Sequence, residues 1–153
     1  MCIRDRPGTH PFGDFWANVF VTLQIDPGTL LRQLEADFRL AGGKLEIRNF
    51  AHADEILSLS ELVVFNCTGL GSVELFGDDV LTPAKGQLVF FPPDSAVDYM
   101  TFNGGQGQLY MFPRNDVLLL GGTFRVGDWS RNPEADETER IVEEHRKLFS
   151  SMG

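Results

Sequence analysis

Hydrophobic and polar positions along the chain follow two different patterns, one before about residue 80 and one after it. Residues 19–25, VFVTLQI, alternate apolar and polar side chains, which predicts a strand. Residues 26–43 then place an apolar side chain at every fourth position, between an Asp-Pro pair and a Gly-Gly pair. This spacing predicts a helix that begins at the proline and ends at the glycines.

Two more strands are predicted in the first half, on either side of a short helix or turn at residues 52–59. Residues 44–50, KLEIRNF, form the first and residues 62–65, LVVF, the second. The run LVVF is apolar at every position, which is typical of a strand buried on both faces of a parallel sheet. Asn-Cys-Thr-Gly follows it directly, and such small residues allow another molecule to approach the backbone.

The second half reads as strands separated by glycine and proline, followed by one helix. The strands are predicted at 86–91, 98–102, 108–112 and 117–124. Their close spacing favours an antiparallel meander. The helix, residues 136–150, places Ile141, His145 and Leu148 on one face. The predicted fold class is therefore α/β (α+β), an α/β region followed by an antiparallel sheet.

Charge and cysteine content exclude several classes of function. The net charge is −9 and the pI is about 4.7, so the chain offers no basic surface for nucleic acid or anionic lipid. No apolar run approaches the roughly 20 residues that cross a bilayer, and we expect a cytoplasmic protein. Two cysteines, Cys2 and Cys67, and three scattered histidines predict neither a disulfide framework nor a metal site. The oligomeric state stays open.

Four segments carry a resemblance to a known family: NCTGLGS, PAKGQLVFF, YMFP and LGGTFRVGDWS. In this order and spacing they resemble the central part of the FAD-dependent D-amino-acid oxidase family, over about residues 19–149. The resemblance implies FAD as cofactor and a small-molecule amino acid, of the D series, as substrate. It also implies oxidation to the imino acid by hydride transfer to the flavin, with O₂ reoxidising the cofactor. No protein acid or base is required, so we predict no catalytic residue in this chain.

The resemblance also assigns cofactor contacts. It implies that Cys67, Thr68 and Gly69 lie beside the adenosine and pyrophosphate side of FAD, where small residues permit close approach. Phe50 matches, by position, the end of an earlier strand that faces the adenine. Without the resemblance, a strand that ends in Asn-Cys-Thr-Gly is read as an ordinary turn. Cys67 is then a small buried hydrophobic residue rather than a nucleophile.

Tyr110, in YMFP, is the candidate substrate residue. The resemblance implies that its hydroxyl holds the substrate carboxylate, and the alternative is a tyrosine that only packs on its strand. Gln106 stands where some members have a second active-site tyrosine. In LGGTFRVGDWS we expect close packing at the glycines, a turn at Asp128 and Trp129, and an exposed Arg125 that is a weaker candidate for binding an anion. We expect the acidic segment after it to be a solvated helix face.

The resemblance also sets the expected domains, listed here: a non-native or disordered lead-in at 1–14, a partial FAD-binding α/β region at 15–82, and a substrate-domain region at 83–153. No GxGxxG turn opens a strand-helix unit, so we expect the chain to be a fragment of the enzyme and inactive alone. Two alternatives remain. One is an FAD-dependent oxidase of the glycine or sarcosine type, and the other is a non-catalytic binding domain.

Overall fold

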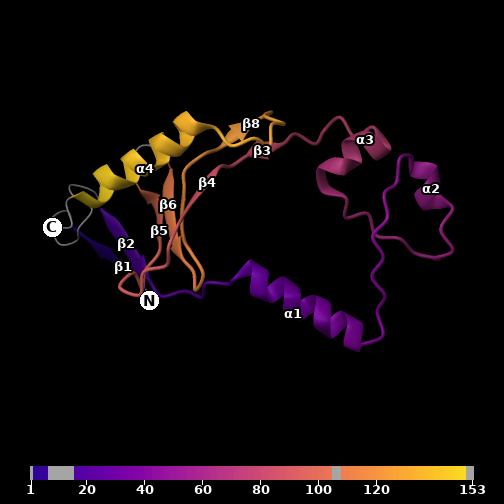
Figure 1. Ribbon diagram of the computed structural model, residues 1–153, viewed down its shortest axis with the longest axis horizontal. Helices are drawn as coiled ribbons and strands as arrows, with labels where there is room; N and C mark the ends of the chain where they lie inside the picture. The colour runs from indigo at the N-terminus through magenta and orange to yellow at the C-terminus, as the bar shows by residue number, and fades with distance from the viewer. Residues whose placement is uncertain (1, 7–15, 105–107, 151–153) are drawn as a thin grey trace. The chain divides into compact units, whose positions relative to one another are not determined.

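A computed structural model describes residues 2–6, 16–104 and 108–150 of the chain, shown in Figure 1. The chain divides into two compact units. Unit 1 takes its residues from Met1–Asp26, Lys85–Arg125 and Trp129–Gly153, and unit 2 consists of Pro27–Ala84 and Val126–Asp128. Helices and antiparallel sheets occur together, which confirms the mixed α/β fold class. The boundary near residue 83 between an FAD-binding region and a substrate-domain region remains a prediction.

Unit 1 is built around a four-stranded antiparallel sheet in the order β4-β7-β6-β5. Its strands are β4 (Leu88–Phe91), β5 (Thr101–Gly104), β6 (Leu109–Pro113) and β7 (Leu118–Gly121). A tight turn joins β6 to β7, closed by the hydrogen bond that the Arg114 amide donates to the Val117 carbonyl at 2.8 Å. All four strands fall within segments predicted from the sequence or overlap them. The predicted four-stranded meander is wrong for the first strand, because β4 pairs with β7 and not with β5, and only β5, β6 and β7 follow one another as a meander.

Helix α4 (Ala135–Phe149) lies along one face of this sheet, in contact with β4, β6 and β7 (Figure 1). Ile141 is completely buried and packs with Met111 and Leu120 at the centre of the core. His145 is also buried, so the predicted helix and its inward face are confirmed. Because side chains alternate along a strand, the residues beside Met111 and Leu120 point to the opposite face.

That opposite face carries apolar side chains that unit 1 leaves largely accessible, and we call it the open face. Its residues are Leu88, Phe90, Phe102, Tyr110, Phe112 and Leu119. Phe102 is 70% exposed and Phe90 is 58% exposed, whereas Leu119 is buried among its neighbours. The sheet therefore has one face packed on a helix and one face on which apolar and aromatic side chains are presented.

Two small two-stranded sheets complete the strand pairings. In one, β1 (Cys2–Asp5) pairs antiparallel with β2 (Ala17–Phe20), and in the other β3 (Ala84–Lys85) is the neighbour of β8 (Arg125–Val126). The strand predicted at 19–25 ends at Phe20, because no strand of the described residues lies beside 21–25 and Val21 is 93% exposed. Residues 2–5 of the predicted lead-in thus form β1, and residues 7–14 lie outside the described part of the chain.

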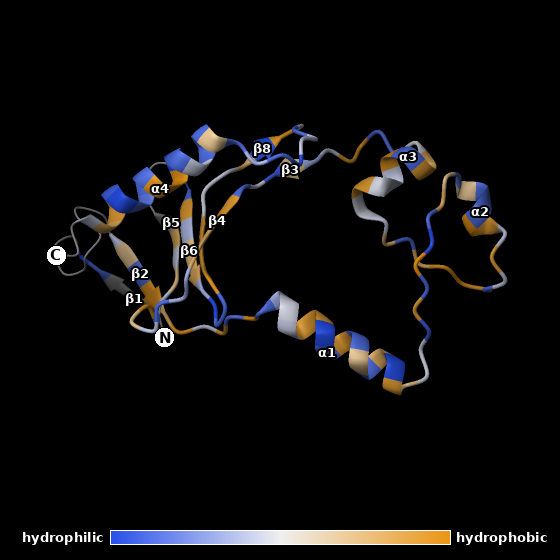
Figure 2. Ribbon diagram, in the orientation of Figure 1, coloured by the Kyte–Doolittle hydropathy of each residue, from blue (hydrophilic) through white to orange (hydrophobic). Residues whose placement is uncertain are grey.

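Unit 2 contains the clearest helix of the sequence analysis. Helix α1 (Pro27–Leu40) begins at the predicted proline, and Gly42 follows its end in the left-handed region with φ +90°. The short elements α2 (Ala53–Leu57), η1 (Gly69–Gly71) and α3 (Ser72–Phe76) come after it. Figure 2 shows apolar and polar residues mixed along α1, whose predicted apolar positions are all exposed within the described residues.

The strands predicted at 44–50 and 62–65 are wrong for this structure, in which neither segment is a strand. The run LVVF was expected to be buried on both faces, yet Leu62 is fully exposed and Phe65 is 85% exposed. A buried strand needs hydrogen-bonding partners on both edges and apolar cover on both faces. Among the described residues no strand flanks either segment, so an apolar sequence alone does not produce the sheet.

Candidate functional site

The open face of the sheet in unit 1 presents Tyr110 at its centre. Tyr110 lies on β6 directly opposite Gly121 on β7, and its phenol ring covers the place where a side chain at Gly121 would project. The ring is flanked by Phe102, with centroids 6.3 Å apart, and by Phe112 at 5.4 Å. The expectation of close packing at the paired glycines is confirmed at Gly121, where the absence of a Cβ admits the ring.

The hydroxyl of Tyr110 differs from the ring in its surroundings. The ring is packed, but the structure gives the hydroxyl no hydrogen-bond partner among the described residues. The ordinary pKa of a tyrosine hydroxyl is 10.0 and burial raises that of Tyr110 further, so the group is protonated at neutral pH, as an unshifted tyrosine would be, and can donate a hydrogen bond. The side chain therefore combines a fixed ring with an available neutral donor, which is what a carboxylate needs as a partner.

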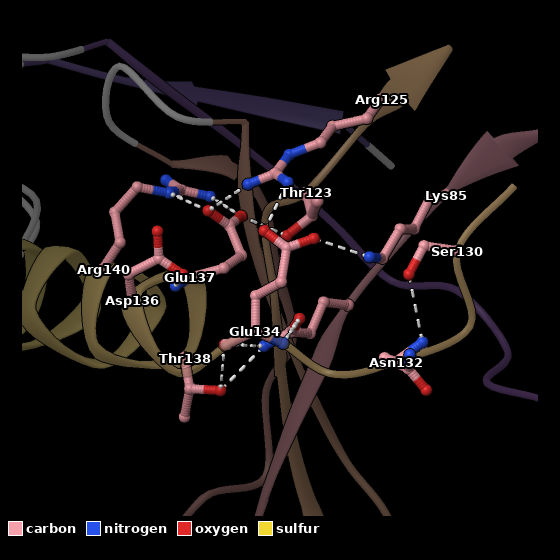
Figure 3. A network of polar contacts seen from close by, with 11 residues as sticks. Lys85, Thr123, Arg125, Ser130, Asn132, Glu134, Asp136, Glu137, Thr138 and Arg140 are labelled. Carbon is pink, nitrogen blue, oxygen red and sulfur yellow. Dashed lines mark hydrogen bonds and ion pairs between the residues drawn. The ribbon is translucent and has the colours of Figure 1, made fainter. Parts of the chain in front are cut away.

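Figure 3 shows a second arrangement in unit 1, a network of polar side chains at the start of α4 that we call the polar clamp. Its residues are Lys85, Gln87, Thr123, Arg125, Glu134, Glu137, Thr138 and Arg140. Glu134 accepts hydrogen bonds from Lys85 and from Arg125, both at 2.6 Å. The side chain of Gln87 donates to the Glu134 carbonyl at 2.8 Å and accepts from the Glu134 amide at 2.9 Å.

Glu137 is the buried carboxylate of the polar clamp. It accepts hydrogen bonds from Arg140 at 2.6 and 2.9 Å and from the Thr123 hydroxyl, and Arg125 lies 3.3 Å away. The Arg140 hydrogen bond, opposed by burial and aided by Thr123 and the two guanidinium charges, lowers the pKa of Glu137 to about 2. Because its cations and carboxylates are paired with one another, the clamp fixes the start of α4 to the strands.

Two expectations about this region are therefore wrong. The acidic segment is not simply a solvated helix face, because Glu137 is buried and paired. Arg125 was expected to be exposed, but its side chain is partly buried and its guanidinium pairs with the carboxylates of Glu134 and Glu137. The spacing of Glu134, Glu137 and Arg140 by three residues places them along one side of the helix, and that signal in the sequence could have revealed the clamp.

In unit 2, NCTGLGS forms a turn held by three polar side chains. The side-chain oxygen Oδ1 of Asn66 accepts a hydrogen bond from the main-chain N–H of Thr68 at 3.1 Å and another from the Thr68 hydroxyl at 2.7 Å. Ser72, which is buried, receives a hydrogen bond from the Asn66 amide at 3.1 Å and lies 2.7 Å from the Thr68 hydroxyl. Gly69 adopts φ +56°, and nothing lies within 4 Å of the position its Cβ would take. The turn reading is confirmed, and open space remains above it.

The chemistry of this turn fits one edge of a dinucleotide cofactor. Cys67 is exposed, so the interpretation that it is buried is wrong. Main chain at residues 67–69 lies at the surface, where its polar groups can meet phosphate or ribose oxygens, and Gly69 puts no side chain in the way. Among residues 2–6, 16–104 and 108–150, no group of three His, Cys, Asp or Glu side chains is arranged to hold a metal ion.

Phe50 makes no described contact with this turn. It is partly buried, and the Arg48 guanidinium lies 5.0 Å from its ring centroid. The residue does not end a strand, because residues 44–50 form none, and nothing in the described residues joins it to Thr68 or Gly69. Gln106, the position of the second tyrosine in some members, lies outside the described residues.

In the part of the chain that the structure covers, no helix is both long and apolar enough to cross a membrane.

Comparisons with known proteins show which family this chain resembles. A family model described as "FAD dependent oxidoreductase" matches residues 6–153. Human D-aspartate oxidase is 30% identical over 127 residues, 83% of this chain and 36% of that protein. D-amino-acid oxidases of Dictyostelium discoideum and Streptomyces coelicolor are 32% and 33% identical, each over 77% of this chain and over 33% and 37% of their own length. The chain thus spans about a third of the length of these relatives.

Proposed function

The chain belongs to the family of FAD-dependent oxidoreductases, and from this premise we propose that it forms part of an enzyme that oxidises an amino acid to the imino acid. The names of its relatives, D-aspartate oxidase and D-amino-acid oxidase, support a D-amino acid as the substrate. Within the enzyme, unit 1 supplies the sheet that faces the substrate. Unit 2 supplies part of the contact with the cofactor.

One observation carries the proposal: Tyr110 stands on the open face with its ring packed and its hydroxyl available. A neutral phenol donates to a carboxylate oxygen, and a hydrogen bond to a charged group contributes about 1.5 to 3 kcal/mol. The aromatic neighbours Phe102 and Phe112 lie on either side of the phenol ring, with centroids 6.3 Å and 5.4 Å from it, and hold it in place. The hydroxyl binds the substrate carboxylate and so orients Cα.

The cofactor contact follows from the turn at residues 66–72. When bound, FAD supplies the chemistry by accepting a hydride from the substrate Cα, and O₂ then reoxidises it. The backbone of Cys67, Thr68 and Gly69 would hold the adenosine and pyrophosphate part of the cofactor, because this turn is exposed and Gly69 leaves the space above it open. Asn66 and Ser72 hold the turn in place through their hydrogen bonds to Thr68. This chain holds and orients, and it provides no acid or base for the reaction.

Substituting Tyr110 with phenylalanine in the full-length, FAD-loaded protein tests the proposal. Tyr110→Phe keeps the ring in its packed position and removes only the hydroxyl. We expect kcat/KM for D-amino acids to fall about 10- to 100-fold, the equivalent of about 1.5 to 3 kcal/mol. If only KM rises, the hydroxyl binds the carboxylate equally in the ground state and the transition state. If kcat falls as well, the hydroxyl also aligns Cα for hydride transfer.

An amine substrate without a carboxylate provides the internal control for Tyr110→Phe. Its kcat/KM should change far less, because the deleted hydroxyl has no carboxylate to bind. Equal losses for both substrates would point to general damage of the open face. Unchanged kinetics for every D-amino acid would remove Tyr110 from the substrate site and leave it as a packed strand residue.

A further inference from the structure

His145, in the second half of α4, contacts main-chain carbonyl oxygens through both of its ring nitrogens. Nδ1 lies 2.8 Å from the carbonyl oxygen of Ile141, one turn earlier in the same helix. Nε2 lies 3.1 Å from the carbonyl oxygen of Tyr110 on β6. The side chain is only 2% exposed, and its ring stacks on Phe149 with centroids 6.2 Å apart. Of these contacts, the one to Tyr110 joins the helix to the strand that carries the candidate substrate residue.

The ladder between β5 and β6 is irregular at Tyr110. Thr101 pairs with Met111 and Gly104 pairs with Leu109, so two residues of β5, Phe102 and Asn103, stand opposite Tyr110 alone. This is a β-bulge, which disrupts pairing locally and often re-aims a side chain. Regular pairing with β5 therefore does not fix the backbone of Tyr110, and a contact from outside the sheet gains importance there.

We propose that His145 is a positioning residue for Tyr110. Its Nε2–H donates to the Tyr110 carbonyl from the helix side of the sheet and so holds the backbone from which the phenol projects on the open face. Helix α4 is itself held in place, because the polar clamp ties its start to the strands and its residue Ile141 is buried against the sheet. The inference rests on the proposed function, in which the Tyr110 hydroxyl binds the substrate carboxylate.

The proposal requires a hydrogen on Nε2. A carbonyl oxygen only accepts, and a neutral imidazole has one N–H, so it can donate to one of its two carbonyl neighbours. The imidazolium donates to both. His145 lines a pocket of about 590 Å³. The charged residues in its lining are Asp94, after β4, and Arg146, which pairs with Glu143 on its own helix. Either the imidazolium or the Nε2–H tautomer satisfies the proposal, whereas the Nδ1–H tautomer does not.

Two substitutions separate the two hydrogen bonds of His145. Glutamine places an amide nitrogen near the position of Nε2 and keeps the donor to Tyr110, whereas asparagine places one near Nδ1 and loses it. In the full-length, FAD-loaded protein, we expect His145→Asn to lower kcat/KM for D-amino acids about 3- to 10-fold, the size of one neutral hydrogen bond. His145→Gln should recover most of that loss. An amine without a carboxylate should respond little to either substitution.

A double-mutant cycle connects the effect to the hydroxyl. In a Tyr110→Phe background, His145→Asn should cause no further loss for D-amino acids, because the group it positions is gone. Equal losses in His145→Asn and His145→Gln, or none in either, would overturn the positioning role. Tyr110→Phe without effect would instead overturn the proposed function, and the inference with it, so the two failures are distinguishable.

The ring nitrogens of His145 can also be observed directly, without catalysis. In the wild-type protein labelled with ¹⁵N-histidine, and assigned by comparison with His145→Gln, we expect the ¹⁵N chemical shift of Nε2 to be that of a protonated nitrogen at the pH of the kinetic assays. The same shift should persist in Tyr110→Phe, where the carbonyl remains. An unprotonated Nε2 would show that no hydrogen bond is donated to Tyr110 and would overturn the proposal, whatever the variants do.

Discussion

The ring of Tyr110 lies over Gly121, its direct partner in the β6–β7 ladder, and fills the space that a side chain at that position would need. Gly121→Ala should therefore displace the ring and with it the hydroxyl. We expect a loss of stability of about 1 to 3 kcal/mol from overpacking and a lower kcat/KM for D-amino acids.

Gly86→Ala is the matched control, since a Cβ at Gly86 would make an ordinary contact of 3.5 Å with the Thr123 carbonyl oxygen. Thermal unfolding and steady-state kinetics of both variants check the prediction for Gly121. If Gly121→Ala behaves like Gly86→Ala, the ring moves aside without consequence for substrate.

The second prediction concerns the core of unit 1. Ile141 is 0% exposed and packs against Met111 and Leu120, so Ile141→Ala should reduce the free energy of unfolding by about 2 to 5 kcal/mol. Ile141→Val should cost only about 0.5 to 1.5 kcal/mol. Urea denaturation measures both losses. A difference of less than 1 kcal/mol between Ile141→Ala and the wild-type protein would show that α4 is not essential to this core.

The third prediction is a pH dependence of stability that arises from Glu137. Its pKa is lowered in the folded state from 4.5 to about 2, mainly by the Arg140 hydrogen bond. A lowered pKa means that the stabilisation is fully present above about pH 4.5 and is lost as the pH falls through about 2. We expect the free energy of unfolding to decrease across this window and Glu137→Gln to flatten the decrease.

Glu139→Gln, at an exposed position of the same helix, is the control for Glu137 and should leave the slope unchanged. Urea denaturation at several pH values between 2 and 6 gives the slope for each protein. A wild-type slope retained in Glu137→Gln would mean that other carboxylates cause the acid sensitivity.

The fourth prediction tests the space above Gly69. Asparagine tolerates the left-handed backbone conformation, so Gly69→Asn should fold while placing a side chain where the cofactor is expected. We expect the affinity of the full-length protein for FAD to fall at least about 10-fold, or about 1.4 kcal/mol. Gly77→Asn is matched in backbone, with φ +66° and open space, and should bind FAD normally. Equal affinities would show that the turn does not contact FAD.

Sequence predicted best those elements that are stabilised by local pattern. Helix α1 carries its own start and stop signals. The strands of unit 1 could be predicted because α4, the helix that covers one face of their sheet, is part of the same chain. The segments at 44–50 and 62–65 failed as strands because a buried strand depends on neighbours, which the described residues do not provide. Local pattern is sufficient for a helix and insufficient for an isolated strand.

The candidate site was predictable to a similar degree. Tyr110 and the turn at Gly69 were selected by a family resemblance, and the structure adds what the sequence could not show: a packed ring and an available hydroxyl. The pairing of Glu137 with Arg140 and Arg125 joins residues whose charges looked solvated in the sequence. The contact from His145 to Tyr110 spans 35 positions and passes through a main-chain carbonyl, so no side-chain pattern could reveal it.

The strand order β4-β7-β6-β5 has a consequence for how unit 1 folds. Strand β5 pairs with β6, and β6 pairs with β7, the next strand in the chain each time, whereas Leu88 of β4 pairs with Gly121 of β7, far along the sequence. Closing the longer loop costs more chain entropy, so we expect the three-stranded meander to form before β4 docks. A destabilising change at Val89 should then speed unfolding, while one in the β6–β7 turn should slow refolding. The surface that presents Tyr110 would accordingly be assembled early, from its most local contacts.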